Sequence, residues 1–559
     1  MSAAPPSPRR VVRWAAVLLL AGAAASLAAT HIVPFSVLLP EAERVYLLGS
    51  FNDWNISDDA LMTNDHGVWR KTLSLEKGEH AYKFKAEGAR IAGDGWRLDW
   101  KATRENRSEP ASFHSVLVVP DDLKTFRARQ RGAQETSRGI EIPLFYDLHP
   151  SNNASFRPSG YFICPLETAP PAGEWKLPAL TDDQPLFTTV PLGDSTVLAV
   201  LDRHPADARF YNRVYFDRNG NRDLTDDPPI NGDTDSPGQR YFYCAFPPVD
   251  LEIEAGGRRM PYRLTMQAGG NLPAQDPSAR YDPEQLSKLH FFTSPQCAYL
   301  GEAMVDGVGY RFAIGDTMAN GSFGDIARLN PDIQYPNQQL YAEGDSFYLS
   351  TDARVGPADG LLLGNFLAVG HRLFAVHLDV PGGKLTLEPR TENVGALETP
   401  ATVDSMALLA ASGDQGLMLR RVAGKVAIPS GTWRLLDYRI EKTDEWGDTW
   451  SLQSSGTENT PALAVPDRET VPLAIGEPLR TVVKISDDAL RQAAAGRPLK
   501  MDLAIFGNAN EIVDGVRHTS GTQTQHKMST RRSDRPGEAI YRIIKPDGER
   551  ITSGSFEYG

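Results

Sequence analysis

The alternation of apolar and polar residues between Val45 and Phe84 constrains the chain most, because its period is that of a β-strand. The run opens as VYLLGSFNDW, turns through Gly, Asn and Asp, and resumes in short apolar runs at 69–73 and 80–84. Trp54 lies in the polar turn, where an indole has little core to fill. The pattern predicts the edge of an antiparallel β-sandwich that displays an aromatic ring.

The rest of the chain has a similar texture. Short apolar runs such as 196–201 and 426–435 alternate with turn residues, and the 559 residues include 48 Gly and 41 Pro. Two short helices are predicted, one at 284–290 after Asp282 and Pro283, and one within 486–495. We therefore expect an all-β protein, with several immunoglobulin-like or early-set sandwiches in tandem and few short helices.

The length requires several domains, since one hydrophobic core rarely serves so long a chain. Changes in composition suggest these bounds: a signal peptide at 1–29, a first sandwich at 31–120, a linker at 121–139, a β-rich domain at 140–396 and a C-terminal sandwich at 397–559.

The first 29 residues have the pattern of a secretory signal. Arg9 and Arg10 precede an apolar run from Trp14 that ends in small residues, with cleavage expected after Ala28 or Ala29. An uncleaved membrane anchor is the alternative, although the apolar run is short for a spanning helix. We expect a secreted, periplasmic or cell-surface protein. The formal net charge of −13 argues against nucleic acid or an anionic membrane as the main partner.

A family resemblance covers about 90 residues near the N-terminus. It is carried by V-Y-L-L-G-S-F-N-D-W at 45–54, G-x-W at 67–69, L-x-L-x-x-G-E-H-x-Y-K-F at 73–84 and a closing strand at 115–119. In this order the segments closely resemble the glycogen-binding domain of AMP-activated kinase β subunits and the early-set carbohydrate-binding modules of family 48. The resemblance implies an early-set sandwich that binds α-glucan or a related polysaccharide.

The resemblance also assigns roles to residues. Trp54 matches a Trp that stacks on a sugar ring, and Lys83 matches a Lys that bonds sugar hydroxyls. The second stacking Trp falls on Trp96, with Trp100 as the alternative, because the intervening turn is longer here. His114 stands where the family has a sugar-contacting Asn. An aromatic stack supplies on the order of 1 kcal/mol beyond area burial.

Structural roles for the same residues stay open. Lys83 could be an ordinary solvated strand residue, and either later Trp could pack beneath the lengthened loop. Trp69 is expected in the core, because G-x-W begins a buried strand in this fold. The early-set domain as a whole could also serve only as a spacer beside its neighbours.

Two loops rich in Asp and Asn follow strands in the second domain. In 217–226 and 316–325, Asp leads, Asn follows four residues later, an apolar residue seven later and Asp nine later, which suggests a duplicated β unit. The first loop spaces oxygen ligands as Ca²⁺ prefers, on Asp217, Asn219, Asn221, Asp223 and Asp226. Ordinary turns held by side-chain-to-backbone hydrogen bonds are the alternative.

The chain contains three cysteines, Cys164, Cys244 and Cys297. An exported protein permits a disulfide, and the first two lie in similar aromatic strand contexts, so they are the expected pair; buried free thiols are the alternative.

Catalytic motifs are absent from the sequence: it has no G-x-S-x-G, H-E-x-x-H, P-loop or dinucleotide fingerprint. The strand and helix alternation of an α-amylase-type barrel is also missing. We therefore expect an exported, non-catalytic protein that binds α-glucan. The alternatives are a polysaccharide hydrolase with its active site within 140–390, and a structural surface protein.

Overall fold

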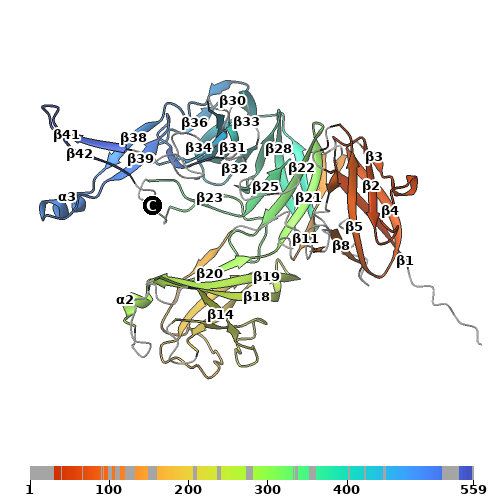
Figure 1. The fold of residues 1–559 in the computed structure, drawn as a ribbon, viewed down its shortest axis with the longest axis horizontal. Coiled ribbons are helices and arrows are strands. Elements are labelled where there is room, and N and C mark those ends of the chain that lie inside the picture. Colours follow the sequence, from red (N-terminus) through yellow and green to blue (C-terminus); the bar gives the residue numbers. More distant parts are fainter. Residues whose placement is uncertain are drawn as a thin grey trace, which may run out of the picture.

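The computed structural model describes residues 30–39, 41–65, 67–89, 91, 94–97, 104–106, 114–119, 133–136, 138–148, 160–204, 210–235, 241–271, 281–331, 333, 338–351, 355, 360–400, 403–420, 424–444, 449–518 and 540–556. Figure 1 shows an elongated molecule, with the N-terminal strands at one end and the C-terminal strands at the other. The described residues are dominated by antiparallel strands, which confirms the all-β prediction.

The N-terminal unit is a sandwich of two sheets. One sheet has the order β1-β4-β3 and the other β2-β5-β8-β7, with β6 beside β5. Their bounds are β1 Thr30–Leu38, β2 Arg44–Gly49, β3 Thr63–Asp65, β4 Val68–Glu76, β5 Gly78–Glu87, β6 Trp96–Arg97, β7 Arg104–Asn106 and β8 His114–Val119. Alternate residues of each strand fill the core, including Tyr82, Phe84 and Trp69, as expected for Trp69. A 3₁₀ turn, η1 (Asp58–Ala60), covers part of the outer face.

The middle of the chain forms three further sheets. The first is β11 (Phe145–Asp147), β21 (Ala298–Val305), β22 (Val308–Gly315), β25 (Ser346–Ser350) and β26 (Gly360–Leu362). The second is β12 (Phe162–Cys164), β20 (Leu289–Pro295), β19 (Arg258–Asn271), β18 (Tyr241–Ala255) and β17 (Asp233–Asp235). The third is β13 (Leu186–Leu192), β14 (Ser195–Asp202), β15 (Arg213–Phe216) and β16 (Ile230–Asn231).

A long sheet joins the middle of the chain to its C-terminal part. In order it contains β38 (Arg480–Lys484), β39 (Asp502–Phe506), β40 (Ile512–His518), β35 (Thr449–Ser455), β34 (Gly431–Thr443), β31 (Val403–Ala410), β32 (Gly416–Arg420), β27 (Phe366–Val369), β28 (Arg372–Asp379), β29 (Lys384–Pro389), β10 (Gly139–Pro143) and β9 (Gln134–Thr136), and β36 (Leu463–Val465) pairs with β34. This sheet runs across the boundary that we predict at residue 396, and β9 lies within the predicted linker.

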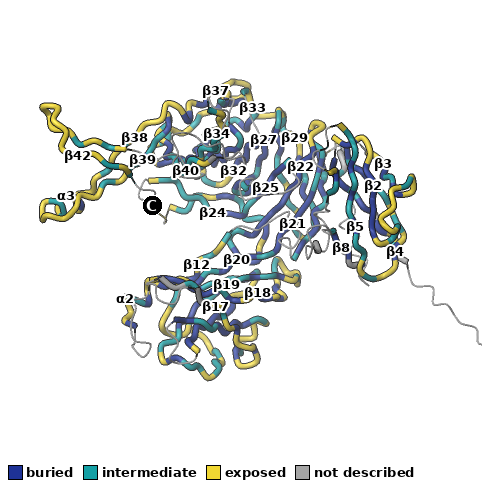
Figure 2. Tube along the Cα trace, in the orientation of Figure 1, coloured by how far each residue is buried: buried dark blue, intermediate teal, exposed yellow. Residues whose placement is uncertain are grey.

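Smaller sheets and two helices complete the described fold. The sheets are β23 (Arg328–Leu329) with β24 (Ala342–Glu343), β33 (Gly424–Pro429) with β30 (Val394–Thr399) and β37 (Thr470–Pro472), and β41 (Ile540–Ile544) with β42 (Arg550–Ser555). Helix α2 is Pro283–Leu286, capped by Asp282, and α3 is Asp487–Ala494, capped by Ser486. Both predicted starts are confirmed, but α2 is shorter than expected because β20 begins at Leu289. Figure 2 shows that α3 and the β41–β42 hairpin are largely exposed.

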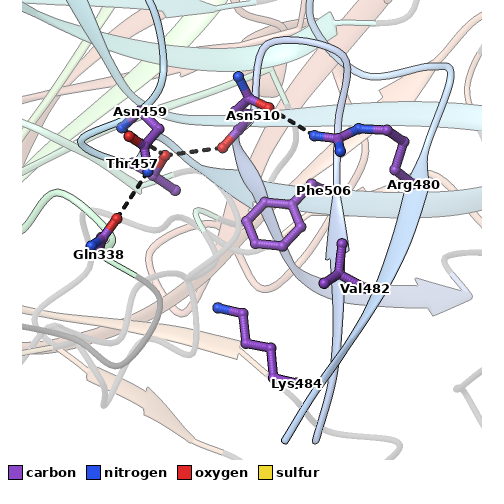
Figure 3. A pocket seen from close by; sticks show the side chains of 8 residues that line it. All are labelled: Gln338, Thr457, Asn459, Arg480, Val482, Lys484, Phe506 and Asn510. Carbon is purple, nitrogen blue, oxygen red and sulfur yellow. Dashed lines mark hydrogen bonds between the residues drawn. The ribbon is translucent and has the colours of Figure 1, made fainter.

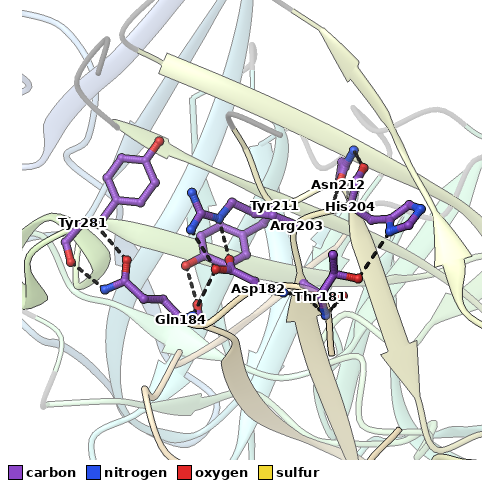
Figure 4. A network of polar contacts seen from close by, with 9 residues as sticks. Thr181, Asp182, Gln184, Arg203, His204, Tyr211, Asn212 and Tyr281 are labelled. Carbon is purple, nitrogen blue, oxygen red and sulfur yellow. Dashed lines mark hydrogen bonds and ion pairs between the residues drawn. The ribbon is translucent and has the colours of Figure 1, made fainter. Parts of the chain in front are cut away.

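A buried ion pair fixes the start of the third sheet. The Arg203 guanidinium donates to Asp182, with Nη2 2.7 Å from Oδ1, and both side chains are almost fully buried. The rings of Tyr211 and Tyr281 lie beside the guanidinium, with centroids 5.7 and 5.5 Å from its central carbon. Figure 4 shows these residues as one network that reaches Gln184. The network ties the segment before β13 to the end of β14, and its pairing limits the cost of burying both charges.

The expected disulfide between Cys164 and Cys244 is wrong. The described cysteines are free and buried. Cys164 pairs with Phe291, Phe291 with Ala268 and Ala268 with Cys244, so the two thiols lie on one row of the second sheet, three strands apart. Three strand spacings are about 14 Å, twice the reach of a disulfide.

No helix among the described residues has the length and apolar character needed to cross a bilayer, and residues 1–29 lie outside the described part.

Candidate functional site

Trp54 is held in a turn with unusual backbone geometry. The turn follows β2, and the Asn52 side chain closes it by accepting from the Gly49 N–H at 2.8 Å and donating to the Leu47 carbonyl at 2.9 Å. Asp53 and Trp54 both have positive φ, 50° and 58°. Such φ values are rare for a bulky residue, so the backbone at Trp54 is strained. The indole remains 38% exposed, which makes it available to a ligand.

Lys83 points away from the core of the sandwich. Its neighbours Tyr82 and Phe84 are buried, and the period of a strand places Lys83 and Lys85 together on the outer face of β5. Partial burial lowers the pKa of Lys83 from its ordinary value, while the charge of Asp94 opposes this shift. The ammonium group is therefore supported on the sheet rather than extended freely into water.

Trp96 lies on β6, beside the two lysines. Its ring centroid is 5.6 Å from Lys83 Nζ and 5.2 Å from Lys85 Nζ. The ring also packs against a small apolar cluster that includes Tyr46 and Leu48. Trp96 is thus half-buried, with its ring packed on this cluster and both ammonium groups lying over it. Lys85 was missed in the sequence, although its place two residues after Lys83 in one strand indicates the same face.

His114 is the first residue of β8 and lies between Trp54 and Lys83 on the outer face. Its ring lies 6.2 Å from the Trp54 ring between centroids, with an angle of 68° between the planes. Ser115 pairs with Tyr82, so the antiparallel register places His114 opposite Lys83 on the neighbouring strand. The structure therefore brings Trp54 beside His114 and Lys83 beside Trp96, on the outer side of β2, β5 and β8. Trp100 lies outside the described residues.

The module contacts the next part of the chain through its other sheet, the one that contains β1. Leu38, at the end of β1, is only 6% exposed although it alternates with the core residues Val37 and Leu39. Gly309, in β22, lies directly against it, so that a Cβ on Gly309 would collide with the Leu38 side chain. The module thus contacts the middle of the chain through the sheet that contains β1, and Trp54 keeps its exposure.

The comparison with known families bears on this module. Residues 22–103 match the family model of carbohydrate-binding module 48, the isoamylase N-terminal domain. The chain therefore carries a carbohydrate-binding module of family 48 near its N-terminus, as the resemblance of its strands and turns implies. The matched stretch contains Trp54, Lys83, Trp96 and Trp100, whereas His114 lies beyond it.

Partial matches to larger proteins point the same way. Over 120 residues the chain is 31% identical to a 1,4-alpha-glucan branching enzyme of Corynebacterium jeikeium, covering 21% of this chain and 16% of the enzyme. Over 145 residues it is 32% identical to the branching enzyme of Bacillus caldolyticus, covering 24% of this chain and 20% of the enzyme. The chain thus spans a fifth or less of the length of these relatives.

The predicted calcium loop is closed by its own hydrogen bonds. The buried carboxylate of Asp217 accepts from the N–H groups of Asn221 and Arg222, each at 3.1 Å. Asn219 Oδ1 accepts from the Asn221 N–H, and Asp223 binds Lys176 at 2.7 Å. The described residues contain no group of three or more His, Cys, Asp or Glu arranged to hold a metal. These contacts fit the alternative of ordinary turns, and calcium stays a prediction.

The second loop repeats the first in three dimensions. Asp316 accepts from the N–H groups of Asn320 and Gly321 at 3.2 and 2.7 Å, the same relative positions as in the first loop. Burial raises the pKa of Asp316 to about 7, and burial with the charge of Asp316 raises that of Asp345 to about 8. Both carboxyls are fully buried, and each accepts hydrogen bonds from backbone N–H groups of the loop.

Proposed function

We propose that this protein binds α-glucan on the outer face formed by β5, β6, β8 and the turn that follows β2. The observation that carries the proposal is the strained and exposed Trp54, held beside His114 within a module of family 48. An exposed indole can stack on the apolar face of a pyranose ring. Lys83 can donate hydrogen bonds to sugar hydroxyls, and the supported ring of Trp96 extends the apolar surface.

The proposal includes the absence of catalysis. A glycosidase of the usual kind needs two carboxyl groups that reach the scissile bond from opposite sides. Asp316 and Asp345 have the raised pKa values expected of a general acid, but both are fully buried and accept backbone N–H groups. Their burial argues against these two residues as a catalytic pair. Release of reducing ends from a panel of glucans would contradict this part of the proposal.

Affinity electrophoresis tests the binding itself. Native gels that contain glycogen or amylose should retard the wild-type chain relative to gels without polymer. Trp54→Ala should weaken retardation about tenfold in apparent affinity, since a lost aromatic stack costs about 1.5 kcal/mol. Ile32→Ala is the matched control, because it removes an exposed apolar side chain from the other sheet. A wild-type chain that no glucan gel retards would overturn the proposal.

Export is a further part of the proposal, supported by the N-terminal sequence. The mature protein should begin after Ala28 or Ala29 and should be recovered outside the cytoplasm. N-terminal sequencing of the recovered chain checks this. A chain that retains residues 1–29 and is recovered in the membrane fraction would support the uncleaved anchor instead. Calcium-dependent melting without glucan binding would support the alternative of a structural spacer.

A further inference from the structure

A polar cleft of about 620 Å³ opens in the C-terminal part, far from the family 48 module. Figure 3 shows its walls, and Figure 1 places β38 and β39 at the end of the molecule opposite β1 to β5. The volume lies within the usual range of about 300–1,000 Å³ for small-molecule sites. Gln338, from the segment before β24, reaches the cleft beside residues that follow it by more than a hundred positions in the sequence.

The antiparallel pair β38 and β39, which α3 connects, builds one wall by strand alternation. Arg480, Val482 and Lys484 share one face of β38, and the register places Phe506 opposite Arg480. Phe506 is half-buried, and Lys484 Nζ lies over its ring, 5.4 Å from the centroid. This wall therefore presents an aromatic ring packed with a cationic side chain.

Three carboxamide side chains line the rest of the cleft, two of them bonded to each other and the third bonded to Arg480. Asn459 Nδ2 donates to Gln338 Oε1 at 2.9 Å, and Asn510 Oδ1 accepts from Arg480 Nη2 at 2.7 Å. Gln338 has a positive φ of 58°, which is uncommon for a residue with a long side chain, and Asn510 has a φ of 64°, which asparagine adopts readily in turns. The lining residues include no carboxylate.

We infer that this cleft is a second saccharide-binding site. Carboxamides offer a donor and an acceptor side by side, which matches the neighbouring hydroxyls of a sugar. An aromatic ring supplies the apolar partner for the ring face, and Arg480 supplies further donors. The inference takes its ligand class from the proposed function but stands on different residues. A chain with a site at each end binds long polymers with avidity and cross-links them.

Calorimetry on the full-length chain separates the two sites. The titrants are maltoheptaose, cellohexaose and xylohexaose, and the parent is the double variant Trp54→Ala/Trp96→Ala. This parent should keep a weaker site for at least one of these oligosaccharides. Phe506→Ala and, independently, Asn459→Ala should each weaken that residual binding at least tenfold. Asn459 is exposed, so its substitution keeps the inference testable even if Phe506→Ala unfolds the hairpin.

Val483→Ala is the control, because this exposed side chain lies on the other face of β38. The outcomes distinguish the two proposals. Residual binding that Asn459→Ala removes and Val483→Ala preserves supports the cleft. A double variant that binds none of the three oligosaccharides overturns the cleft and leaves the proposed function intact if the wild type binds maltoheptaose. Residual binding that neither cleft variant weakens also overturns it. Wild-type binding that fails throughout contradicts both proposals.

Discussion

Asn221 and Asn320 make the same pair of hydrogen bonds in two loops that lie far apart in the sequence. Each Nδ2 donates to the Asp five residues later at 2.8 Å, Asp226 in one loop and Asp325 in the other. Each Oδ1 accepts from the N–H two residues later, at 2.7 and 2.8 Å. The duplication predicted from the spacing of Asp and Asn is therefore visible in the hydrogen bonds.

The paired loops predict how two glycine substitutions differ. Gly220→Ala should lower the free energy of unfolding by only about 1 kcal/mol, since its positive φ is strained for Ala but no atom lies within 4 Å. The second loop already has Ala319 at this position, also with positive φ. Gly321→Ala should cost about 3 kcal/mol, because the new Cβ would lie 2.7 Å from the Gly193 nitrogen. Urea unfolding of both variants measures the difference. Equal losses would contradict the close packing of Gly321 against Gly193.

Buried carboxyls predict that this protein is more stable in mild acid. Asp345 has an ordinary pKa of 3.8, raised to about 8 in the folded chain, and that of Asp316 is raised to about 7. Between pH 4 and 8 the folded state therefore holds protons that the unfolded state has released. Stability must fall as pH rises through this window.

Thermal unfolding at pH 5.5 and pH 8 checks this expectation. The midpoint should be higher at pH 5.5, and Asp345→Asn should reduce the dependence on pH, because it removes one titrating group. A midpoint that rises between pH 5.5 and 8 would show that the carboxyls are ionised in the folded state.

The positive φ of Trp54 predicts that two substitutions that remove the indole differ in stability. Trp54→Gly and Trp54→Ala both remove the indole, so both should lose most glucan binding. The free energy of unfolding of the glycine variant should nevertheless be about 1 kcal/mol larger than that of the alanine variant, because glycine adopts a φ of 58° without strain. Denaturant titration of the two variants makes the comparison. Identical stabilities would mean that the turn is relaxed in solution.

Lys83 is expected to contribute a charged hydrogen bond to the ligand. Lys83→Ala should weaken glucan affinity about tenfold, since such bonds contribute about 1.5 kcal/mol or more. Lys77→Ala makes the same change of charge at an exposed position in the turn between β4 and β5, and should leave affinity unchanged. If both variants bind as the wild type does, Lys83 is an ordinary surface lysine.

The free cysteines predict indifference to reductant. Burial raises the pKa of Cys164 and of Cys297 to about 12, so neither forms appreciable thiolate at neutral pH. A thiol reagent should modify the folded chain slowly and should reach three thiols only in denaturant. Dithiothreitol should not shift the melting midpoint. A drop of several degrees on reduction would indicate a disulfide.

Local features were predictable because neighbouring residues decide them. The turn at Trp54 begins at Gly49 and is closed by the Asn52 side chain. Both helix starts depend on a capping residue, Asp282 or Ser486, that accepts from the N–H three residues later. These interactions join residues only a few positions apart, so the sequence alone predicts them.

The sequence by itself determined the all-β character, the module at the N-terminus and the repeated Asp and Asn loops. Tertiary structure alone decided that Cys164 and Cys244 lie too far apart to bond, that one sheet crosses residue 396, and that Gln338 meets Asn459 across a cleft. The physical reason is that strand order and register follow from packing over the whole core. Apolar residues with the same alternation can satisfy many pairings, and only the folded chain selects one.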